Sequence, residues 1–120
     1  MAEPLFSALP WPGAVLGPIA DFPEGRIVEC VFGAGREPFR IIVLRKGDSV
    51  HGFINRCPHF QLPLNLEPGR FLMWDDDEVM CIHHSATFRL SDGYCTGGPC
   101  LGMRLDPFPL ELIDGRVVVT

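Results

Sequence analysis

Two short segments of the sequence carry the side chains best suited to bind a metal. Residues 57–59 read Cys-Pro-His, and residues 81–84 read Cys-Ile-His-His. The two segments are separated by 21 residues, 60–80. Loops that each offer a thiolate sulfur and an imidazole nitrogen can enclose a metal centre from opposite sides. The candidate ligands are Cys57, His59, Cys81 and His84.

The spacing of these ligands bears on the kind of centre. A structural zinc site accepts two cysteines and two histidines, but zinc patterns usually pair cysteine with cysteine and histidine with histidine. A C-x-H followed by a C-x-x-H mixes the two types. This mixture suits a binuclear iron centre with both sulfurs on one iron and both nitrogens on the other. A zinc-stabilised interaction module remains an alternative from a different class of protein.

The flanks of these motifs resemble those of the Rieske [2Fe-2S] family, in which two histidines replace two cysteines. Members typically carry N-x-C-P-H with a leucine five residues after the histidine, and residues 55–59 with Leu64 fit this pattern. Members then have an aromatic residue four positions after the second histidine, a turn and a Gly-Pro loop. Phe88, residues 91–93 (Ser-Asp-Gly) and residues 97–99 (Gly-Gly-Pro) follow in that order.

The resemblance covers roughly residues 26–120 and implies one [2Fe-2S] cluster of the Rieske type. In such a cluster Cys57 and Cys81 would bind the inner iron, and His59 and His84 would bind the outer, more exposed iron. Neutral imidazoles in place of two thiolates reduce the repulsion that an added electron meets. The reduction potential is therefore expected within about −150 to +300 mV.

The chain departs from the family pattern at three positions of the ligand loops. Gln61 stands where glycine is common in the first loop. Ser85 and Ala86 follow the second histidine, where glycine and then an aromatic residue or serine are usual. Glycine in such loops lets backbone amides approach the sulfides closely. We therefore expect the hydrogen bonding to the cluster to differ from that of typical members.

Short strands are the elements that must position these loops. Apolar runs alternate with turn signals, and the Asp-Gly pair at 114–115 joins the last two runs into a predicted hairpin. The stretch 70–92 lacks Gly and Pro, but its aspartates at 75–77 disfavour a helix and suit a hairpin tip. The predicted class is all-β, a Rieske fold of antiparallel sheets with a cluster-binding subdomain. Strands are expected near 26–32, 39–46, 50–55, 70–74, 78–82, 87–90, 109–113 and 116–120.

Length and composition indicate one domain over residues 1–120. Hydrophobic residues make up 47% of the chain, which is enough for one packed core. Residues 1–25 are expected to form a Pro-rich N-terminal arm, because four prolines interrupt the first 20 positions. About residues 52–100 would form the cluster-binding lobe, and strands from both chain ends would form the base.

Charge and hydropathy argue against a nucleic-acid binder and a membrane-spanning protein, and the start of the chain bears on its location in the cell. Ten Lys and Arg against 15 Asp and Glu give a net charge of −5, which disfavours a nucleic-acid binder. No stretch has the about 20 uninterrupted apolar residues of a membrane span. The first basic side chain is Arg26, so the start of the chain lacks the basic region of a secretory signal. A cytoplasmic location is therefore expected.

The resemblance implies a one-electron carrier, a Rieske-type ferredoxin. Its partners would be a flavin or ferredoxin reductase and a terminal oxidoreductase such as an oxygenase. An oxygenase itself needs a further iron bound by two histidines and a carboxylate, and no histidine follows His84. No catalytic residue is therefore assigned in this chain. An alternative is a small accessory subunit of a larger oxidoreductase, similar to the nitrite reductase small subunit.

The remaining cysteines and one further histidine have simpler interpretations. Cys95 and Cys100 flank Thr-Gly-Gly-Pro and could form a small disulfide, but a cytoplasmic protein favours reduced thiols packed near the loop. Cys30 lies in an apolar run and is expected in the core. His83 is expected to be a plain exposed side chain.

Overall fold

The structure, a computed structural model, describes residues 5–6, 11–33, 38–58, 61–75 and 77–120. In this part of the chain strands predominate, with one short 3-10 helix, η1, at Ile19–Asp21. This confirms the all-β prediction. No helix of the described residues is long and apolar enough to cross a membrane. The strands are β1 (Leu5–Phe6), β2 (Val15–Pro18), β3 (Ile27–Phe32), β4 (Phe39–Lys46), β5 (Ser49–Ile54), β6 (Leu72–Asp75), β7 (Glu78–Met80), β8 (Thr87–Arg89), β9 (Cys95–Gly97), β10 (Leu110–Ile113) and β11 (Arg116–Val119).

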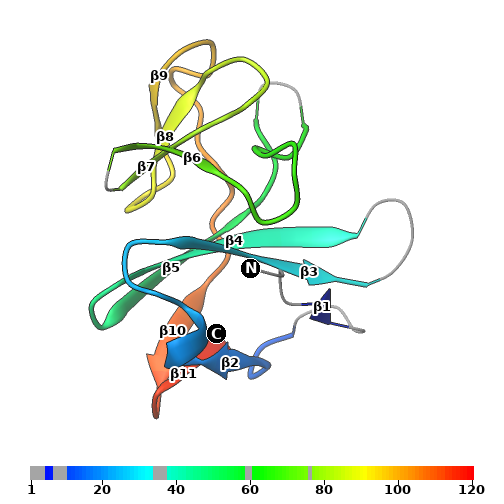
Figure 1. Cartoon of the computed structure of the whole chain (residues 1–120), viewed down its shortest axis with the longest axis vertical. Coiled ribbons are helices and arrows are strands. Elements are labelled where there is room, and N and C mark those ends of the chain that lie inside the picture. The colour runs from blue at the N-terminus through cyan, green and yellow to red at the C-terminus, as the bar shows by residue number, and fades with distance from the viewer. Residues whose placement is uncertain (1–4, 7–10, 34–37, 59–60, 76) are drawn as a thin grey trace.

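The strands form three sheets that lie one above another (Figure 1). The middle sheet has the order β1-β3-β4-β5, the upper sheet β6-β7-β8-β9 and the lower sheet β10-β11-β2. The described pairings between these strands are antiparallel, except for the parallel pair β1 and β3. The loops that carry the candidate ligands are named here the ligand-bearing loops. The first, residues 55–71, follows β5, and the second, residues 81–86, follows β7. Both belong to the upper half of the molecule (Figure 1).

The middle sheet is buried on both faces because its side chains alternate between two cores. On β4, Ile42 and Leu44 join an upper core that is shared with the upper sheet. Their neighbours Ile41 and Val43 point the other way, into a lower core that is shared with the lower sheet. Successive side chains of a strand point to opposite faces. A strand covered on both faces therefore reads as a continuous apolar run, as β3 and β4 do.

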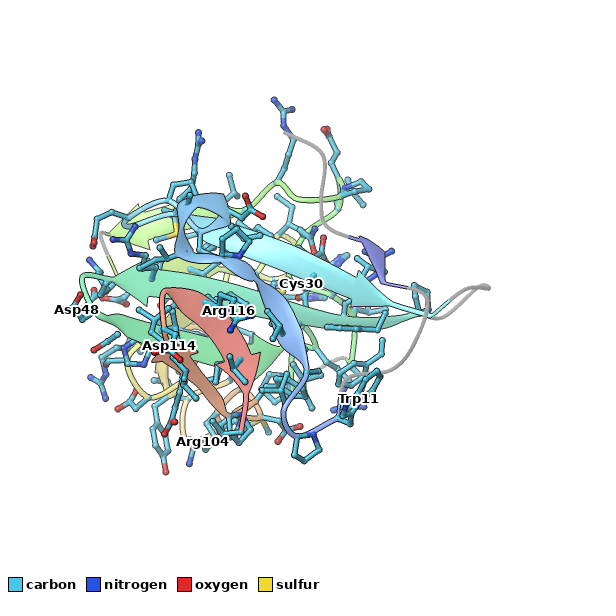
Figure 2. All side chains as sticks on the ribbon, turned by 90° about the horizontal axis from the view of Figure 1, so that it is seen from below. Trp11, Cys30, Asp48, Arg104, Asp114 and Arg116 are labelled. Atoms are coloured by element: carbon cyan, nitrogen blue, oxygen red, sulfur yellow. The ribbon has the colours of Figure 1, made fainter. Side chains whose placement is uncertain are left out.

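Part of the segment expected as a Pro-rich arm belongs to the lower sheet. Strand β2 pairs with β11, and Leu16 and Phe22 are buried in the lower core. Figure 2 shows this base from below, with the β10–β11 turn marked by Asp114 and Arg116. Asp114 and Gly115 have φ angles of 52° and 75°, as a two-residue type I′ hairpin turn requires. The predicted Asp-Gly hairpin is confirmed.

The stretch 70–92 contains three strands, β6, β7 and β8, and no helix among its described residues. Strands β6 and β7 pair as a hairpin, with Asp75 opposite Glu78. The prediction of strand, turn and strand around the acidic run is therefore confirmed, although Asp76 lies outside the described residues.

A buried carboxylate fastens the first ligand-bearing loop to the middle sheet. Glu29, in the middle of β3, is 1% exposed. Its Oε2 accepts a hydrogen bond from Asn55 Nδ2 at 2.7 Å, and its Oε1 accepts from Asn65 Nδ2 at 3.1 Å. The backbone N–H of Gly69 donates to Oε1 at 3.0 Å, and Arg40 adds an ion pair at 3.4 Å. A buried carboxylate needs such partners, so Glu29 holds both ends of this loop.

Asn55 carries this constraint from Glu29 to the candidate ligand. Its Nδ2 also donates to Asn65 Oδ1 at 2.8 Å, and its Oδ1 accepts the Leu64 N–H at 2.8 Å. Because Asn55 stands two residues before Cys57, its side chain closes the loop that presents this cysteine. The asparagine of the N-x-C-P-H motif is therefore a structural anchor of the loop.

Both ligand-bearing loops close by the same pair of backbone hydrogen bonds. In each, the fourth residue after the cysteine donates its N–H to the cysteine carbonyl, at 2.7 Å in the first loop and 3.0 Å in the second. The cysteine N–H then donates to the carbonyl of the fifth residue, at 2.7 Å in both loops. The fourth residues are Gln61 and Ser85, with φ angles of 60° and 61°. These are the positions where the family pattern commonly has glycine, so the left-handed turn is kept without glycine.

We expect Glu29→Ala to lower the free energy of unfolding by about 3–5 kcal/mol, because it removes one of the two acceptors of each of the buried amides of Asn55 and Asn65 and the charged partner of Arg40. Urea denaturation followed by circular dichroism measures this loss. Glu111→Ala, at an exposed position of β10, is the control and should change stability by less than about 0.5 kcal/mol. A loss no larger than that of the control would contradict the anchoring role of Glu29.

Ser85→Gly should raise the free energy of unfolding by about 0.5–1 kcal/mol, because glycine adopts a positive φ without the clash of a Cβ atom. Ser49→Gly, in the extended strand β5, should instead lower it, because glycine in a strand costs backbone entropy. The same urea experiment compares the two variants. Changes of the same sign would show that the backbone at Ser85 is not strained.

Candidate metal centre

Three of the four candidate ligands lie in the described part of the chain, and His59 lies outside it. Cys57 and Cys81 are each 1% exposed and belong to the upper core. His84, by contrast, is exposed. In the described part of the chain no group of three or more His, Cys, Asp or Glu side chains is placed so that it could hold a metal ion. The structure thus brings two sulfurs together in the core and leaves one imidazole at the surface.

The two ligand-bearing loops lie against each other. The backbone N–H of Ile82, next to Cys81, donates to the carbonyl of Leu64 at 2.9 Å. Leu64 is also the residue that Asn55 holds. The chain of contacts from Glu29 therefore reaches the second loop through the first, and it fixes the position of each cysteine relative to the other.

The surroundings of Cys81 act on its charge in opposite directions. Burial raises the pKa of the Cys81 thiol above its ordinary value, and the adjacent Cys57 raises it further. The backbone N–H groups of His83 and His84 donate to the Cys81 sulfur and lower this pKa. A bound metal ion would reverse the balance, because a coordinating thiol is deprotonated outright. The N–H donors are placed to stabilise the resulting thiolate.

These donors fit a [2Fe-2S] cluster with sulfur ligands on its inner side and imidazole ligands on its outer side. The sulfurs are adjacent and shielded from water, and backbone N–H groups already point at one of them. The exposed His84 lies on the solvent side. The Rieske resemblance implies that the sulfur ligands of the inner iron are buried and that the imidazole ligands of the outer iron are exposed. The burial of Cys57 and Cys81 and the exposure of His84 agree with this arrangement.

The loop after β9 covers this site. A Cβ atom on Gly98, whose φ is 86°, would lie 2.8 Å from the Cα of Ala86. The covering loop therefore presses on the second ligand loop at a distance that only glycine allows. Two residues further on, Cys100 is 0% exposed, and its Sγ lies 3.7 Å from the Sγ of Cys57. The Gly-Pro loop thus brings a third sulfur to the site.

The cysteines outside the candidate ligand set occupy different surroundings. All five cysteines of the chain are free thiols in the structure. The Sγ of Cys95 donates to the carbonyl of Gly97 at 3.0 Å, whereas Cys100 contacts Cys57. Cys30 lies in the lower core, as expected. His83, expected to be exposed, is half-buried, whereas the adjacent His84 is exposed.

Sequence patterns did not single out Glu29 or Asn65 as parts of the site, and they placed Cys100 only near the Gly-Pro loop without a contact to a candidate ligand. One signal for Glu29 exists, since a carboxylate in the middle of the apolar run 26–32 must find buried partners. No local pattern marks Asn65. Cys100 contacts a residue 43 positions away in the chain, so its role follows only from the fold.

Several solved structures share this fold. The ferredoxin of carbazole 1,9a-dioxygenase from Nocardioides aromaticivorans IC177 matches with a TM-score of 0.65 and 19% identity, over 94% of this chain and 98% of that chain. A structure of reduced oxygenase in complex with oxidized ferredoxin in carbazole 1,9a-dioxygenase matches with a TM-score of 0.67 and 25% identity, over 89% and 100%. The terminal oxygenase of carbazole 1,9a-dioxygenase from Novosphingobium sp. KA1 matches with a TM-score of 0.69 and 18% identity, over 91% and 28%. The chain thus spans nearly all of the ferredoxin and less than a third of the oxygenase.

No sequence among the curated proteins matches the chain. The sequence model of the Rieske [2Fe-2S] domain, however, matches residues 14–109. This match begins before β2 and ends just before β10, so it takes in both ligand-bearing loops and the covering loop. The cofactor of this family is one Rieske-type [2Fe-2S] cluster, which the buried sulfurs and exposed imidazole described above suit. The chain belongs to the Rieske [2Fe-2S] domain family.

Proposed function

We propose that this chain is a one-electron carrier, a Rieske-type ferredoxin that passes electrons from a reductase to a terminal oxidoreductase such as an oxygenase. Its membership of the Rieske family is the observation that carries the proposal. The match to the ferredoxin of carbazole 1,9a-dioxygenase over 98% of that chain supports the same role. In this proposal the upper half of the molecule, about residues 52–100, is the cluster-binding lobe.

The ligands in this proposal divide into a buried and an exposed pair. When bound, the cluster supplies a one-electron redox couple within about −150 to +300 mV. The protein keeps water from the sulfur side by burying both cysteines in the upper core. It leaves the imidazole side open, so that His84 offers the route for an electron to a partner. Cys57 and Cys81 would hold the inner iron, and His59 and His84 the outer iron.

Apolar side chains on the three loops of the site suit a docking surface. Leu62 on the first ligand loop is 43% exposed, Ile82 on the second is 42% exposed, and Leu101 on the covering loop is 66% exposed. Exposed apolar groups on the loops that surround a site favour contact with another protein, because such contact removes them from water. The proposed partners are a flavin or ferredoxin reductase and a terminal oxygenase or other oxidoreductase.

We place this carrier in the cytoplasm. Five free cysteines in a chain of 120 residues are typical of a reducing compartment, because thiols at such density oxidise readily elsewhere.

The alternative function, a small accessory subunit of a larger oxidoreductase, differs from a carrier in how it associates with its enzyme. Pull-down from the native host separates the two, because a permanent subunit co-purifies with its enzyme whereas a carrier does not.

Freshly purified, iron-replete protein should take up one electron per chain on anaerobic reduction with dithionite. The reduced protein should then give a Rieske-type EPR signal, because one of its irons has imidazole ligands and the other has thiolate ligands. Low-temperature EPR and metal analysis measure both properties. Colourless protein with stoichiometric zinc would overturn the proposal in favour of a zinc-stabilised module.

His84→Cys should leave the chain folded and move the reduction potential to a more negative value by on the order of 100 mV or more, because it adds a negative thiolate to the centre. Redox titration followed by EPR measures the shift. His83→Cys is the matched control, since it places the same side chain on the neighbouring residue and should leave the potential unchanged. Equal potentials for His84→Cys and the wild type would show that His84 is not a ligand.

A further inference from the structure

A third sulfur lies beside one of the two sulfurs proposed as iron ligands, that of Cys57. The Sγ of Cys100 is 3.7 Å from the Sγ of Cys57, within the range of a hydrogen bond between sulfur atoms. This separation is far longer than the about 2.05 Å of a disulfide bond. Cys100 is 0% exposed and shares the upper core with Cys57 and Cys81. The two thiols are therefore in contact without being bonded.

The covering loop holds Cys100 in this position from both sides. Before it, Gly98 packs against the backbone of Ala86 in the second ligand loop. After it, the backbone N–H of Met103 donates to the carbonyl of Cys100 at 2.8 Å and closes a turn. Since the backbone is fixed on each side, the thiol is directed at Cys57 by the fold.

Iron ligation determines which of the two sulfurs donates. A cysteine bound to iron is a thiolate and has no proton to give. Cys100 lies outside the proposed ligand set and is a thiol whose S–H can donate, so it is the donor of the pair. The hydrogen bond in the loaded protein then runs from Cys100 to the sulfur of Cys57.

We propose that Cys100 is a positioning residue that raises the reduction potential of the centre by donating a hydrogen bond to the sulfur of Cys57. The inference rests on the proposed function, because it takes Cys57 as an iron ligand. An added electron increases the negative charge shared by the ligand sulfurs. A donor aimed at one of them therefore stabilises the reduced form more than the oxidised form.

The test compares the reduction potentials of Cys100→Ala and Cys100→Ser with that of the wild type, by redox titration followed by EPR. Alanine removes the donor, and the equilibrium should move against the reduced form by about threefold to tenfold. Tenfold corresponds to a potential about 59 mV lower for a one-electron couple. Serine keeps a donor of similar size, so its potential should equal or exceed that of the wild type.

Cys30→Ala is the matched control, because Cys30 is equally buried but lies in the lower core. Figure 2 labels it on β3. This variant should leave the potential unchanged, which separates the effect of the donor from the general effect of removing a buried thiol. A shift in Cys30→Ala as large as that in Cys100→Ala would overturn the inference.

Four further outcomes would overturn either the role proposed for Cys100 or the proposed function. An unchanged potential in Cys100→Ala with the Rieske-type signal retained overturns the inference but leaves the proposed function intact. Loss of the signal from both Cys100 variants overturns it too, because Cys100 would then hold the centre rather than tune it. If only Cys100→Ala fails to load, a potential of Cys100→Ser below the wild type overturns the inference. A wild-type protein without the signal overturns the proposed function itself.

Discussion

Cys57 and Cys81 lie side by side in an apolar core, where the two thiolates of the proposed centre would carry a high electrostatic cost. Both side chains are almost completely shielded from water, so solvent could not stabilise such a charge. In the proposed centre the stabilisation would come from bound iron and from fixed donors. Backbone N–H groups of the second loop point at Cys81, and the thiol of Cys100 lies beside Cys57. A loop that moved by the width of an atom would break these contacts.

A buried carboxylate, that of Glu29, fixes the position of the loops that carry these cysteines. Glu29 extends from the middle sheet into the first ligand loop, and its partners Asn55 and Asn65 lie on the two sides of that loop. Through Leu64 the same set of contacts reaches the second loop. The middle sheet therefore acts as the fixed platform, because its two faces are packed between two cores and its strands cannot shift alone.

The backbone turn that closes each ligand-bearing loop needs one residue with a positive φ angle. Each closes through a residue in the left-handed conformation, although Gln61 and Ser85 are not glycines. Gln61 gains a hydrogen bond from its side-chain Nε2 to the carbonyl of Pro58 at 3.1 Å, which offsets part of the backbone strain. The two loops share one hydrogen-bonding pattern although different side chains occupy the left-handed position. The turn geometry is thus the requirement, and glycine is only its easiest solution.

Short-range features could be inferred from the amino-acid order: the C-x-H and C-x-x-H motifs, the apolar runs of β3 and β4, and the Asp-Gly hairpin. Each depends on a few neighbouring residues, whose preferences act wherever the chain folds. The asparagine partners of Glu29, the packing of β2 into the base and the approach of Cys100 to Cys57 join positions 26 to more than 100 residues apart. Such contacts leave no local pattern, because they exist only once distant strands have packed into one core.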